Sequence, residues 1–257
     1  MTAEPGYSDA AGWALFLDFD GTLVDIAERP EAVVVQPGLR NTLTDLQQRL
    51  GGALAIVTGR TITDVDGLLP DLGLDICGLH GLELRVGSHM SRPAGLAELG
   101  PEIAALRTRL AGYPGVVVED KRVGVAVHWR MAPEAAGEAA AAAAELALRL
   151  GPGYRLQDGK AVREIVPAHA GKGGGVRALM AYPPYLGRKP AFVGDDRTDE
   201  DGFAAVNALG GLSVKIGQGA TAAAHRIASP AAFRDWLAAW MDRPPATSLD
   251  RAARENV

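Results

Sequence analysis

The chain of 257 residues contains a single cysteine, Cys77, and only 5% aromatic residues. One cysteine cannot form an intramolecular disulfide, which is typical of proteins in a reducing compartment. The apolar run at residues 14–17 is far too short to span a membrane, and neither a cationic segment nor a small-residue cleavage site flanks it. We therefore expect a cytoplasmic protein that does not associate with membranes.

The sequence also lacks an excess of positive charge. It has 26 Lys and Arg against 31 Asp and Glu, which gives a formal net charge of -5. Proteins that bind DNA or RNA need clustered Lys and Arg to neutralise phosphates, so we expect no nucleic-acid partner. A small anionic substrate is compatible with this charge, because it needs only a few positive groups at one site.

Short apolar runs alternate with amphipathic helical patterns in the first and last thirds of the chain. Continuous apolar runs are typical of strands buried on both faces, and leucines at steps of three and four are typical of helices. The expected strands are 13–17, 53–57, 191–193 and 212–216, and the expected helices are 37–50, one that begins at 61, 171–180, 199–208 and 231–241. This order predicts an α/β fold, a Rossmann-like doubly wound parallel sheet.

The middle of the chain shows a different pattern, in which apolar and polar residues alternate. Such alternation marks a sheet with one face on a core and the other face free. We expect a hairpin of 116–121 and 123–130, an alanine-rich helix at 133–150, and a second hairpin of 154–157 and 160–166 that turns at Asp158 and Gly159. The pattern predicts an α+β cap domain at residues 91–168, inserted between two parts of a core domain at residues 1–90 and 169–257.

Two carboxylates, Asp18 and Asp20, follow the first predicted strand in the segment Asp-Phe-Asp-Gly-Thr-Leu. Side chains two residues apart on an extended chain project to one side, and two such charges must be neutralised. A divalent cation does this well, and oxygen ligands favour Mg²⁺. Taken alone, the segment is also compatible with an acidic turn at the end of a strand.

A second acidic segment, Gly-Asp-Asp-Arg-Thr-Asp-Glu, follows another buried strand at residues 194–200. Ligands of open parallel sheets bind at the carboxyl ends of the strands, where two acidic clusters would repel each other unless a metal lay between them. We expect Asp195 to be a direct ligand, and Asp196 and Asp199 to act through water or through other ligands. Arg197 is expected to form a local ion pair.

Two further positions, Thr58 and Lys172, stand at the predicted starts of helices. Thr58 offers a hydroxyl and free backbone N–H groups to phosphate oxygens, and Lys172 offers a fixed positive charge to a phosphoryl group. Each also has an ordinary explanation when taken alone, an N-cap threonine and an exposed lysine. The glycine-rich stretch around Lys172 lacks the spacing of a P-loop.

In order and rough spacing, these four segments resemble the motifs of the haloacid dehalogenase superfamily of phosphatases. Within it the chain is similar to the trehalose-6-phosphate phosphatases, at residues 15–23, 78–83, 119–121, 128–130 and 194–203. The resemblance covers nearly the whole chain. It implies an enzyme that hydrolyses trehalose 6-phosphate to trehalose and inorganic phosphate, the last step of trehalose biosynthesis.

The resemblance also implies residue roles. Asp18 is expected to attack phosphorus and form an aspartyl-phosphate, and Asp20 to protonate the leaving sugar oxygen and then activate water. Mg²⁺ is expected on Asp18, the backbone carbonyl of Asp20, and Asp195. Thr58 and Lys172 are expected to contact the phosphoryl oxygens.

The cap is expected to select the sugar, because carboxylates accept hydrogen bonds from hydroxyls and ammonium groups donate to them. The expected substrate-binding residues are Gly21, Thr22, Gly59, Arg60, His80, Gly81, Glu119, Lys121, His128, Arg130 and Glu164. Purely structural roles remain open for His80, His128 and Arg130. We expect a monomer whose cap opens and closes around a sugar phosphate.

Two alternative functions remain open. One is another sugar-phosphate phosphatase of the same class, acting on a sucrose or mannosyl phosphate. The other is a non-catalytic binding module on the same fold, which the presence of Asp18, Asp20 and Lys172 disfavours.

Overall fold

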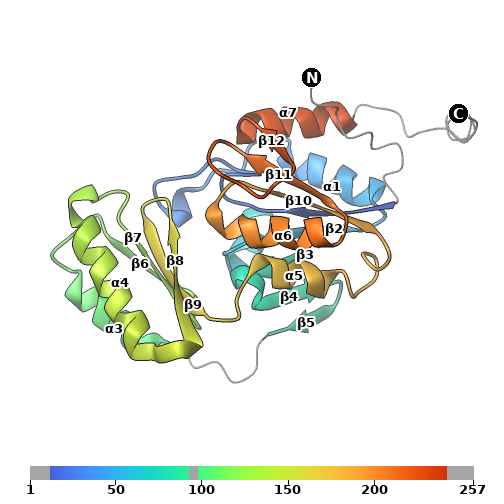
Figure 1. The fold of residues 1–257 in the computed structure, drawn as a ribbon. Helices are drawn as coiled ribbons and strands as arrows, with labels where there is room; N and C mark the ends of the chain where they lie inside the picture. The colour runs from blue at the N-terminus through green and yellow to red at the C-terminus, as the bar shows by residue number, and fades with distance from the viewer. Residues whose placement is uncertain (1–11, 93–97, 242–257) are drawn as a thin grey trace, which may run out of the picture.

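The computed structural model describes residues 12–92 and 98–241. Two parts of different size are visible in Figure 1, each built on its own sheet. The larger part is the core, and the smaller part is inserted in the chain between the fifth strand of the core sheet and the helix that precedes its sixth. The predicted α/β fold with an inserted cap is confirmed. The domain boundaries at 90/91 and 168/169 stay a prediction.

The core contains an eight-stranded sheet with the order β12-β11-β10-β1-β2-β3-β4-β5. The pairs from β12 to β3 are parallel, and β4 and β5 are added antiparallel at one edge. Its strands are β1 Trp13–Leu17, β2 Leu54–Val57, β3 Asp75–Gly78, β4 Glu83–Val86, β5 His89–Ser91, β10 Lys189–Gly194, β11 Leu212–Ile216 and β12 His225–Ile227. Four strands were not predicted. Among them β5 and β12 have only three residues each, too few for a periodic pattern.

Helices cover both faces of the core sheet. In Figure 1, α5 and α6 lie together on one face, and α1 and α7 lie on the other. The connection from β1 runs to β2 and the connection from β10 runs to β11, in opposite directions along the sheet. Right-handed crossovers therefore place α1 and α6 on opposite faces. The core helices are α1 Leu39–Arg49, α2 Ile62–Leu68, α5 Lys172–Leu179, α6 Glu200–Ala208 and α7 Pro230–Met241.

Two of these helices show how the local sequence specifies them. In α1 the predicted leucine stripe is buried, with Leu39, Leu43 and Leu46 in the core. In α2 the N-cap is Thr61, whose hydroxyl accepts the N–H of Asp64 at 3.1 Å, while Asp64 accepts the N–H of Thr61 at 3.2 Å. The expected helix start at residue 61 is therefore confirmed.

The cap contains an antiparallel sheet with the order β6-β7-β9-β8. Helices α3 Gly100–Arg109 and α4 Ala136–Leu150 pack on one face of it, where Leu106, Leu146 and Ile165 are buried together. The strands are β6 Val117–Asp120, β7 Val125–His128, β8 Tyr154–Gly159 and β9 Val162–Pro167. Short 3₁₀ helices occur in both parts: η2 Pro30–Ala32, η3 Leu79–Gly81, η4 Pro133–Ala135, η5 Gly151–Gly153 and η6 Arg197–Asp199.

The turn of the second cap hairpin differs from the prediction. Strand β8 continues through Asp158 and Gly159, and the turn lies at Lys160 and Ala161, whose φ is +60°. The cross-strand pair of Asp158 with Arg163 extends the ladder, and an ion pair of 2.7 Å joins their side chains. Pairing between the strands therefore outweighs the local turn preference of Asp-Gly.

Within residues 12–92 and 98–241, no helix is both long enough and apolar enough to cross a membrane.

Candidate active site

Three carboxylates, those of Asp18, Asp195 and Asp199, meet at the carboxyl end of the core sheet. Strands β1 and β10 are parallel neighbours, with Leu17 opposite Val193, so the residues that follow them emerge side by side. Asp199 reaches the same place from η6. All three are buried, and each offers an oxygen within 4.8 Å of the others. Such a cluster requires a positive partner, because buried like charges repel each other.

Lys172, at the start of α5, is one such partner. Its Nζ lies 2.6 Å from Asp18 Oδ1 and 2.6 Å from Asp199 Oδ1, and the side chain is only 3% exposed. Burial, Asp199 and Asp195 together raise the pKa of Asp18 well above its ordinary 3.8, against the opposing effect of Lys172. Burial disfavours the charged lysine, but Asp18 and Asp199 outweigh it and raise the pKa of Lys172 above 10.5.

The donor set of this cluster also fits a metal ion. Asp195 Oδ1 is buried and has no hydrogen-bond partner among the described residues, while Asp195 Oδ2 accepts from Lys160 Nζ at 2.7 Å. Asp199 is more fully engaged, since its Oδ2 accepts the N–H groups of Asp195 and Asp196 at 3.0 and 2.8 Å. Hard cations prefer such carboxylate oxygens. The three aspartates therefore form a group that could hold a metal ion.

Asp20 has a different neighbour from Asp18. Arg60 Nε donates to Asp20 Oδ2 at 2.7 Å and Arg60 Nη2 donates to Asp20 Oδ1 at 2.8 Å, which is a bidentate ion pair. Burial disfavours the charged guanidinium, but Asp20 outweighs it and raises the pKa of Arg60. Arg60 neutralises the carboxylate of Asp20.

Gly21 and Thr22 form the turn that follows Asp20. Gly21 has a φ of +84°, and a Cβ at this position would lie 2.3 Å from Asp195 Oδ2, so only glycine fits. The hydroxyl of Thr22 donates to Asp18 Oδ2 at 3.2 Å. Gly21 therefore packs against Asp195 and Thr22 binds Asp18, so both residues fix the positions of these carboxylates.

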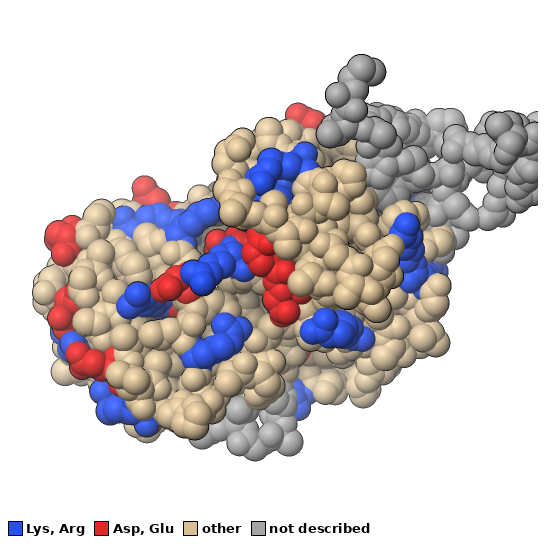
Figure 2. All heavy atoms as spheres, in the orientation of Figure 1, with Lys and Arg blue, Asp and Glu red and all other residues tan. Residues whose placement is uncertain are grey.

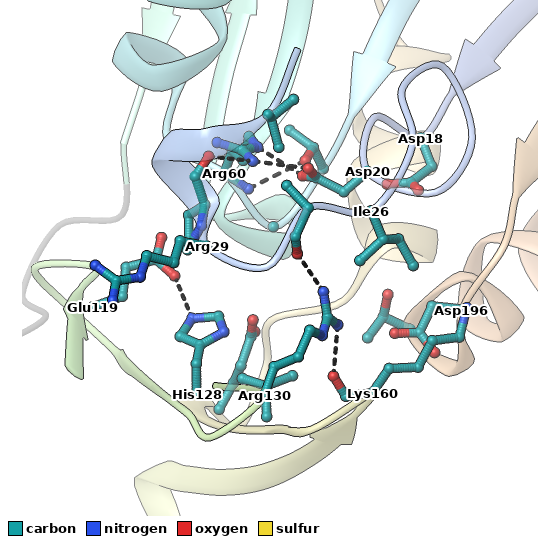
Figure 3. A pocket seen from close by; sticks show the side chains of 18 of the residues that line it. Asp18, Asp20, Ile26, Arg29, Arg60, Glu119, His128, Arg130, Lys160 and Asp196 are labelled. Carbon is teal, nitrogen blue, oxygen red and sulfur yellow. Dashed lines mark hydrogen bonds and ion pairs between the residues drawn. The ribbon is translucent and has the colours of Figure 1, made fainter. Parts of the chain in front are cut away.

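A pocket of about 160 Å³ opens above this floor, between the core and the cap. Figure 3 shows side chains of both parts directed into it. Thirteen predicted site residues line it: Asp18, Asp20, Thr58, Gly59, Arg60, His80, Glu119, Lys121, His128, Arg130, Glu164, Lys172 and Asp196. Five others do not, namely Gly21, Thr22, Gly81, Asp195 and Asp199.

Thr58 and Gly59 form the core edge of the pocket after β2. The side chain of Thr58 is buried, and its Oγ1 accepts the N–H of Arg60 at 3.2 Å. A Cβ at Gly59 would lie 2.5 Å from His80 Nε2, so a larger residue would displace the histidine. The carbonyl of Gly59 accepts from Lys121 Nζ of the cap at 2.9 Å. This loop therefore joins the carboxyl end of the core sheet to the cap.

Glu119, Lys121 and His128 form a charged cluster on the cap side. Glu119 Oε1 lies 3.1 Å from Lys121 Nζ, and Glu119 Oε2 lies 2.8 Å from His128 Nε2, a contact drawn in Figure 3. Burial disfavours the ionised carboxylate, but Lys121 and His128 outweigh it and lower the pKa of Glu119 to about 2. The cluster presents acceptors and donors to hydroxyl groups of a ligand.

His80 connects the core to the cap from the 3₁₀ turn that follows β3. Its Nε2 lies 2.6 Å from Glu164 Oε2 on strand β9. Its backbone N–H donates to Thr58 O at 3.0 Å, and its carbonyl accepts the N–H of Gly171 at 2.5 Å. Gly81 fits closely beside it, since a Cβ there would lie 2.6 Å from the Gly171 carbonyl oxygen. One histidine therefore contacts the loops of Thr58 and Lys172 as well as the cap.

Ala27, Lys160 and Thr198 line the pocket but were not predicted, and the predicted Arg130 contacts the first two of them. Arg130 Nη1 donates to the carbonyl of Ala27, in the loop after the first motif, and Arg130 Nη2 donates to the carbonyl of Lys160 at 2.8 Å (Figure 3). Lys160 itself reaches Asp195, and Thr198 also lines the pocket. The acceptors on Ala27 and Lys160 are backbone carbonyls, which carry no signal in the sequence. The position of Lys160 could have been inferred only from the true turn of its hairpin.

This chain is similar to known proteins over the whole region that forms the site. A family model described as trehalose-phosphatase matches residues 16–231, a span that includes the acidic cluster, Lys172 and the whole cap sheet. The chain belongs to the trehalose-phosphatase family. The family inferred from the motifs is therefore confirmed.

Relatives of this family match the chain over most of its length. A probable trehalose-phosphate phosphatase of Sinorhizobium fredii is 43% identical over 235 residues, which is 90% of this chain and 89% of that protein. The trehalose-6-phosphate phosphatase of Escherichia coli is 39% identical over 239 residues, 92% of this chain and 89% of that protein. A crystal structure of a trehalose-6-phosphate phosphatase related protein has 26% identity and a TM-score of 0.70, and the match covers 88% of this chain and 96% of that one.

Proposed function

We propose that this protein hydrolyses trehalose 6-phosphate to trehalose and inorganic phosphate. The observation that carries the proposal is the position of Asp18, which lies beside Lys172 at the floor of a pocket whose opposite wall carries Glu119, Lys121 and Glu164. The proposal assigns the nucleophile and a phosphate-binding cation to one end of the pocket and sugar-binding groups to the other. The family match and the names of the relatives point to the same substrate.

In the first step, an oxygen of Asp18 forms a bond to phosphorus while the bond between phosphorus and the sugar oxygen breaks. Asp20, which takes up a proton from solvent when it leaves Arg60, gives this proton to the sugar oxygen, so the sugar leaves as the neutral alcohol. The aspartyl-phosphate is then hydrolysed by a water molecule whose proton returns to Asp20. The bidentate contact with Arg60 holds Asp20 at the edge of the pocket until it exchanges that partner for substrate.

Lys172 and Thr58 position the phosphoryl group. Lys172 is fixed by two carboxylates and is buried, so its charge is available at a defined point without reorganisation. Thr58 offers a buried hydroxyl from the end of β2. Preorganised groups of this kind typically contribute about 3 to 4 kcal/mol each to transition-state stabilisation.

We propose Mg²⁺ as the cofactor, which Asp18, Asp195 and the backbone carbonyl of Asp20 would hold. When bound, it would offset the negative charges that keep a carboxylate and a phosphate apart. Asp199, whose oxygens accept from Lys172 and from two backbone N–H groups, would orient these ligands.

The cap residues would read the sugar. Glu119 and Glu164 supply acceptors, and Lys121 and His128 supply donors, around a neutral sugar with many hydroxyls. His80 contacts Glu164 and Gly59 contacts Lys121, so the proposed sugar-binding groups lie next to the proposed phosphate-binding residues when the cap is seated in this way. Closure also excludes water from the attack on phosphorus.

The test is phosphate release from a panel of sugar phosphates, with and without Mg²⁺. We expect trehalose 6-phosphate to be preferred over sucrose 6-phosphate and mannosyl phosphates, and activity to require Mg²⁺. Preference for another sugar phosphate would replace the proposed substrate, and phosphate binding without turnover would indicate a binding module. We further propose a cytoplasmic monomer, which size-exclusion chromatography and cell fractionation would test.

A further inference from the structure

A second, larger cavity lies on the other side of the catalytic residues. It measures about 450 Å³ and lies between cap strand β8 and the core elements α5 and η6. We call it the rear cavity, and define it by Arg155 on β8, Arg177 on α5 and Arg197 on η6. Glu119, Lys121 and His128, which form the cap cluster of the first pocket, do not line it.

The two cavities meet at the catalytic floor. Lys172, His80 and Thr198 line both of them. The contact of His80 with Glu164 stands where the core meets the cap, so the sugar-reading residues lie in the first pocket and the arginines in the rear cavity. A phosphate beside Lys172 could therefore leave through the first pocket or through the rear cavity. The proposed sugar-binding residues line only the first pocket.

The rear cavity carries unpaired positive charge. Arg177 and Arg197 are exposed and have no ion pair or side-chain hydrogen bond among the described residues, contrary to the local ion pair expected for Arg197. Arg155 donates to the carbonyl of Ala170 at 2.7 Å, which leaves its charge without a carboxylate. Figure 2 shows basic and acidic side chains interspersed along the boundary between cap and core on this face.

The two acidic residues of the rear cavity are already engaged. Asp158 Oδ1 accepts from Arg163 at 2.7 Å, and Asp201 Oδ2 accepts the N–H of Gly173 at 2.8 Å. Three arginines therefore face two carboxylates that have partners of their own. Guanidinium groups in this state favour a phosphate, which accepts hydrogen bonds in their planar geometry.

We propose that the rear cavity binds inorganic phosphate and is its route of departure from the catalytic site. The inference rests on the proposed phosphatase function. Phosphate released beside Asp18 and Lys172 passes to Arg177 and Arg197 and leaves between β8 and η6. It does so without passing Glu119 and Lys121, so the cap cluster stays in place on the sugar side.

The test is product inhibition of the full-length, Mg²⁺-loaded enzyme by added inorganic phosphate, with trehalose 6-phosphate as substrate and free sugar as the readout. Phosphate in the catalytic site competes with substrate. Phosphate in the rear cavity binds while substrate is present and blocks departure, so we expect a second, uncompetitive component in the wild type. In the double variant Arg177→Gln/Arg197→Gln its inhibition constant should rise about fivefold or more, the combined effect of two exposed charge pairs. The competitive constant should change by less than about twofold, since neither arginine lines the first pocket.

The matched control is Arg107→Gln/Arg149→Gln, which removes the same charge from exposed positions on α3 and α4 of the cap. An equal change in this control would mean that only long-range charge matters, and would overturn the proposal. Purely competitive inhibition of the wild type would also overturn it. A wild type that does not act on trehalose 6-phosphate would refute the proposed substrate instead. The same inhibition patterns with p-nitrophenyl phosphate would then still decide the phosphate route.

Discussion

His80 Nε2 of the core and Glu164 Oε2 of the cap lie 2.6 Å apart, and their side chains are only 6% and 16% exposed. Burial disfavours the ionised form of Glu164, but His80 and Lys121 outweigh it and lower the pKa of this carboxyl group. The two residues are 84 positions apart in the chain. Their contact therefore reports directly on how the cap is seated on the core.

Replacement of this histidine should impair sugar recognition more than the chemical step. We expect His80→Asn to lower kcat/KM for trehalose 6-phosphate about tenfold or more, because a buried charge loses its partner. Asparagine tolerates the left-handed backbone of position 80, where φ is 54°, so the turn should survive. Kinetics with p-nitrophenyl phosphate provide the comparison. An equal decrease in kcat/KM for both substrates would show that His80 acts only on the residues that bind the phosphoryl group.

Removal of the proposed nucleophile, Asp18, should abolish turnover without unfolding the protein. We expect Asp18→Asn to lower kcat by about a thousandfold or more, as is usual when a covalent nucleophile is lost. The neutral amide also relieves repulsion with Asp195 and Asp199, so the fold should persist. Phosphate release and circular dichroism measure the two effects. Near-wild-type turnover in a folded variant would sink the proposed mechanism.

Loss of Glu119, a carboxylate that we propose binds the sugar, should affect two substrates differently. Glu119→Ala should reduce kcat/KM for trehalose 6-phosphate about a hundredfold, since an unpaired sugar hydroxyl and the freed Lys121 are both left in the pocket. It should affect p-nitrophenyl phosphate by less than about threefold, because that substrate has no hydroxyls to read. Glu145→Ala, on the outer cap helix α4, is the matched control. Parallel losses with both substrates would contradict a sugar-reading role.

Binding of Mg²⁺ should stabilise the folded protein through its buried aspartates. At a concentration 100 times the Kd, a ligand that binds only the native state contributes about 2.7 kcal/mol. For a chain of this size we expect a rise in Tm of about 5 to 10 °C, measured by differential scanning calorimetry. Asp195→Asn should remove most of this rise, because it alters the carboxylate with the unpartnered oxygen. Asp158→Asn in the cap should keep it, and a full rise in both variants would place the metal elsewhere.

Local sequence was sufficient to predict much of the core. Continuous apolar runs predicted β1, β2 and β10, and the leucine spacing predicted α1, because burial on two faces or on one stripe leaves a recognisable pattern. Strand β3, which begins with a buried Asp75 and ends in Gly78, lacks that signature. Its status as a strand depends on pairing with β2 and β4 on either side.

Some features of the candidate site could likewise be predicted from local sequence, and others could not. The acidic motifs fixed Asp18 and Asp195 at strand ends, since each follows its own apolar run in the sequence. The ion pair of Asp18 with Lys172 joins residues 154 positions apart, and the ion pair of Asp20 with Arg60 joins residues 40 positions apart. Both pairs therefore depend on the tertiary fold. The ion pair of Lys160 with Asp195 depends in addition on a hairpin turn that cross-strand pairing moved by two residues.

By itself, the sequence determined the kinds of elements and the family, and it suggested the residues proposed for phosphoryl transfer. These are local properties, because hydrophobic periodicity and sequence motifs depend on residues that are close together in the chain. Only the tertiary structure decided which charge neutralises which, how His80 meets Glu164, and that a rear cavity opens beside Lys172. The physical reason is that ion pairs and cavities form where separate elements pack together, and that packing belongs to the whole chain.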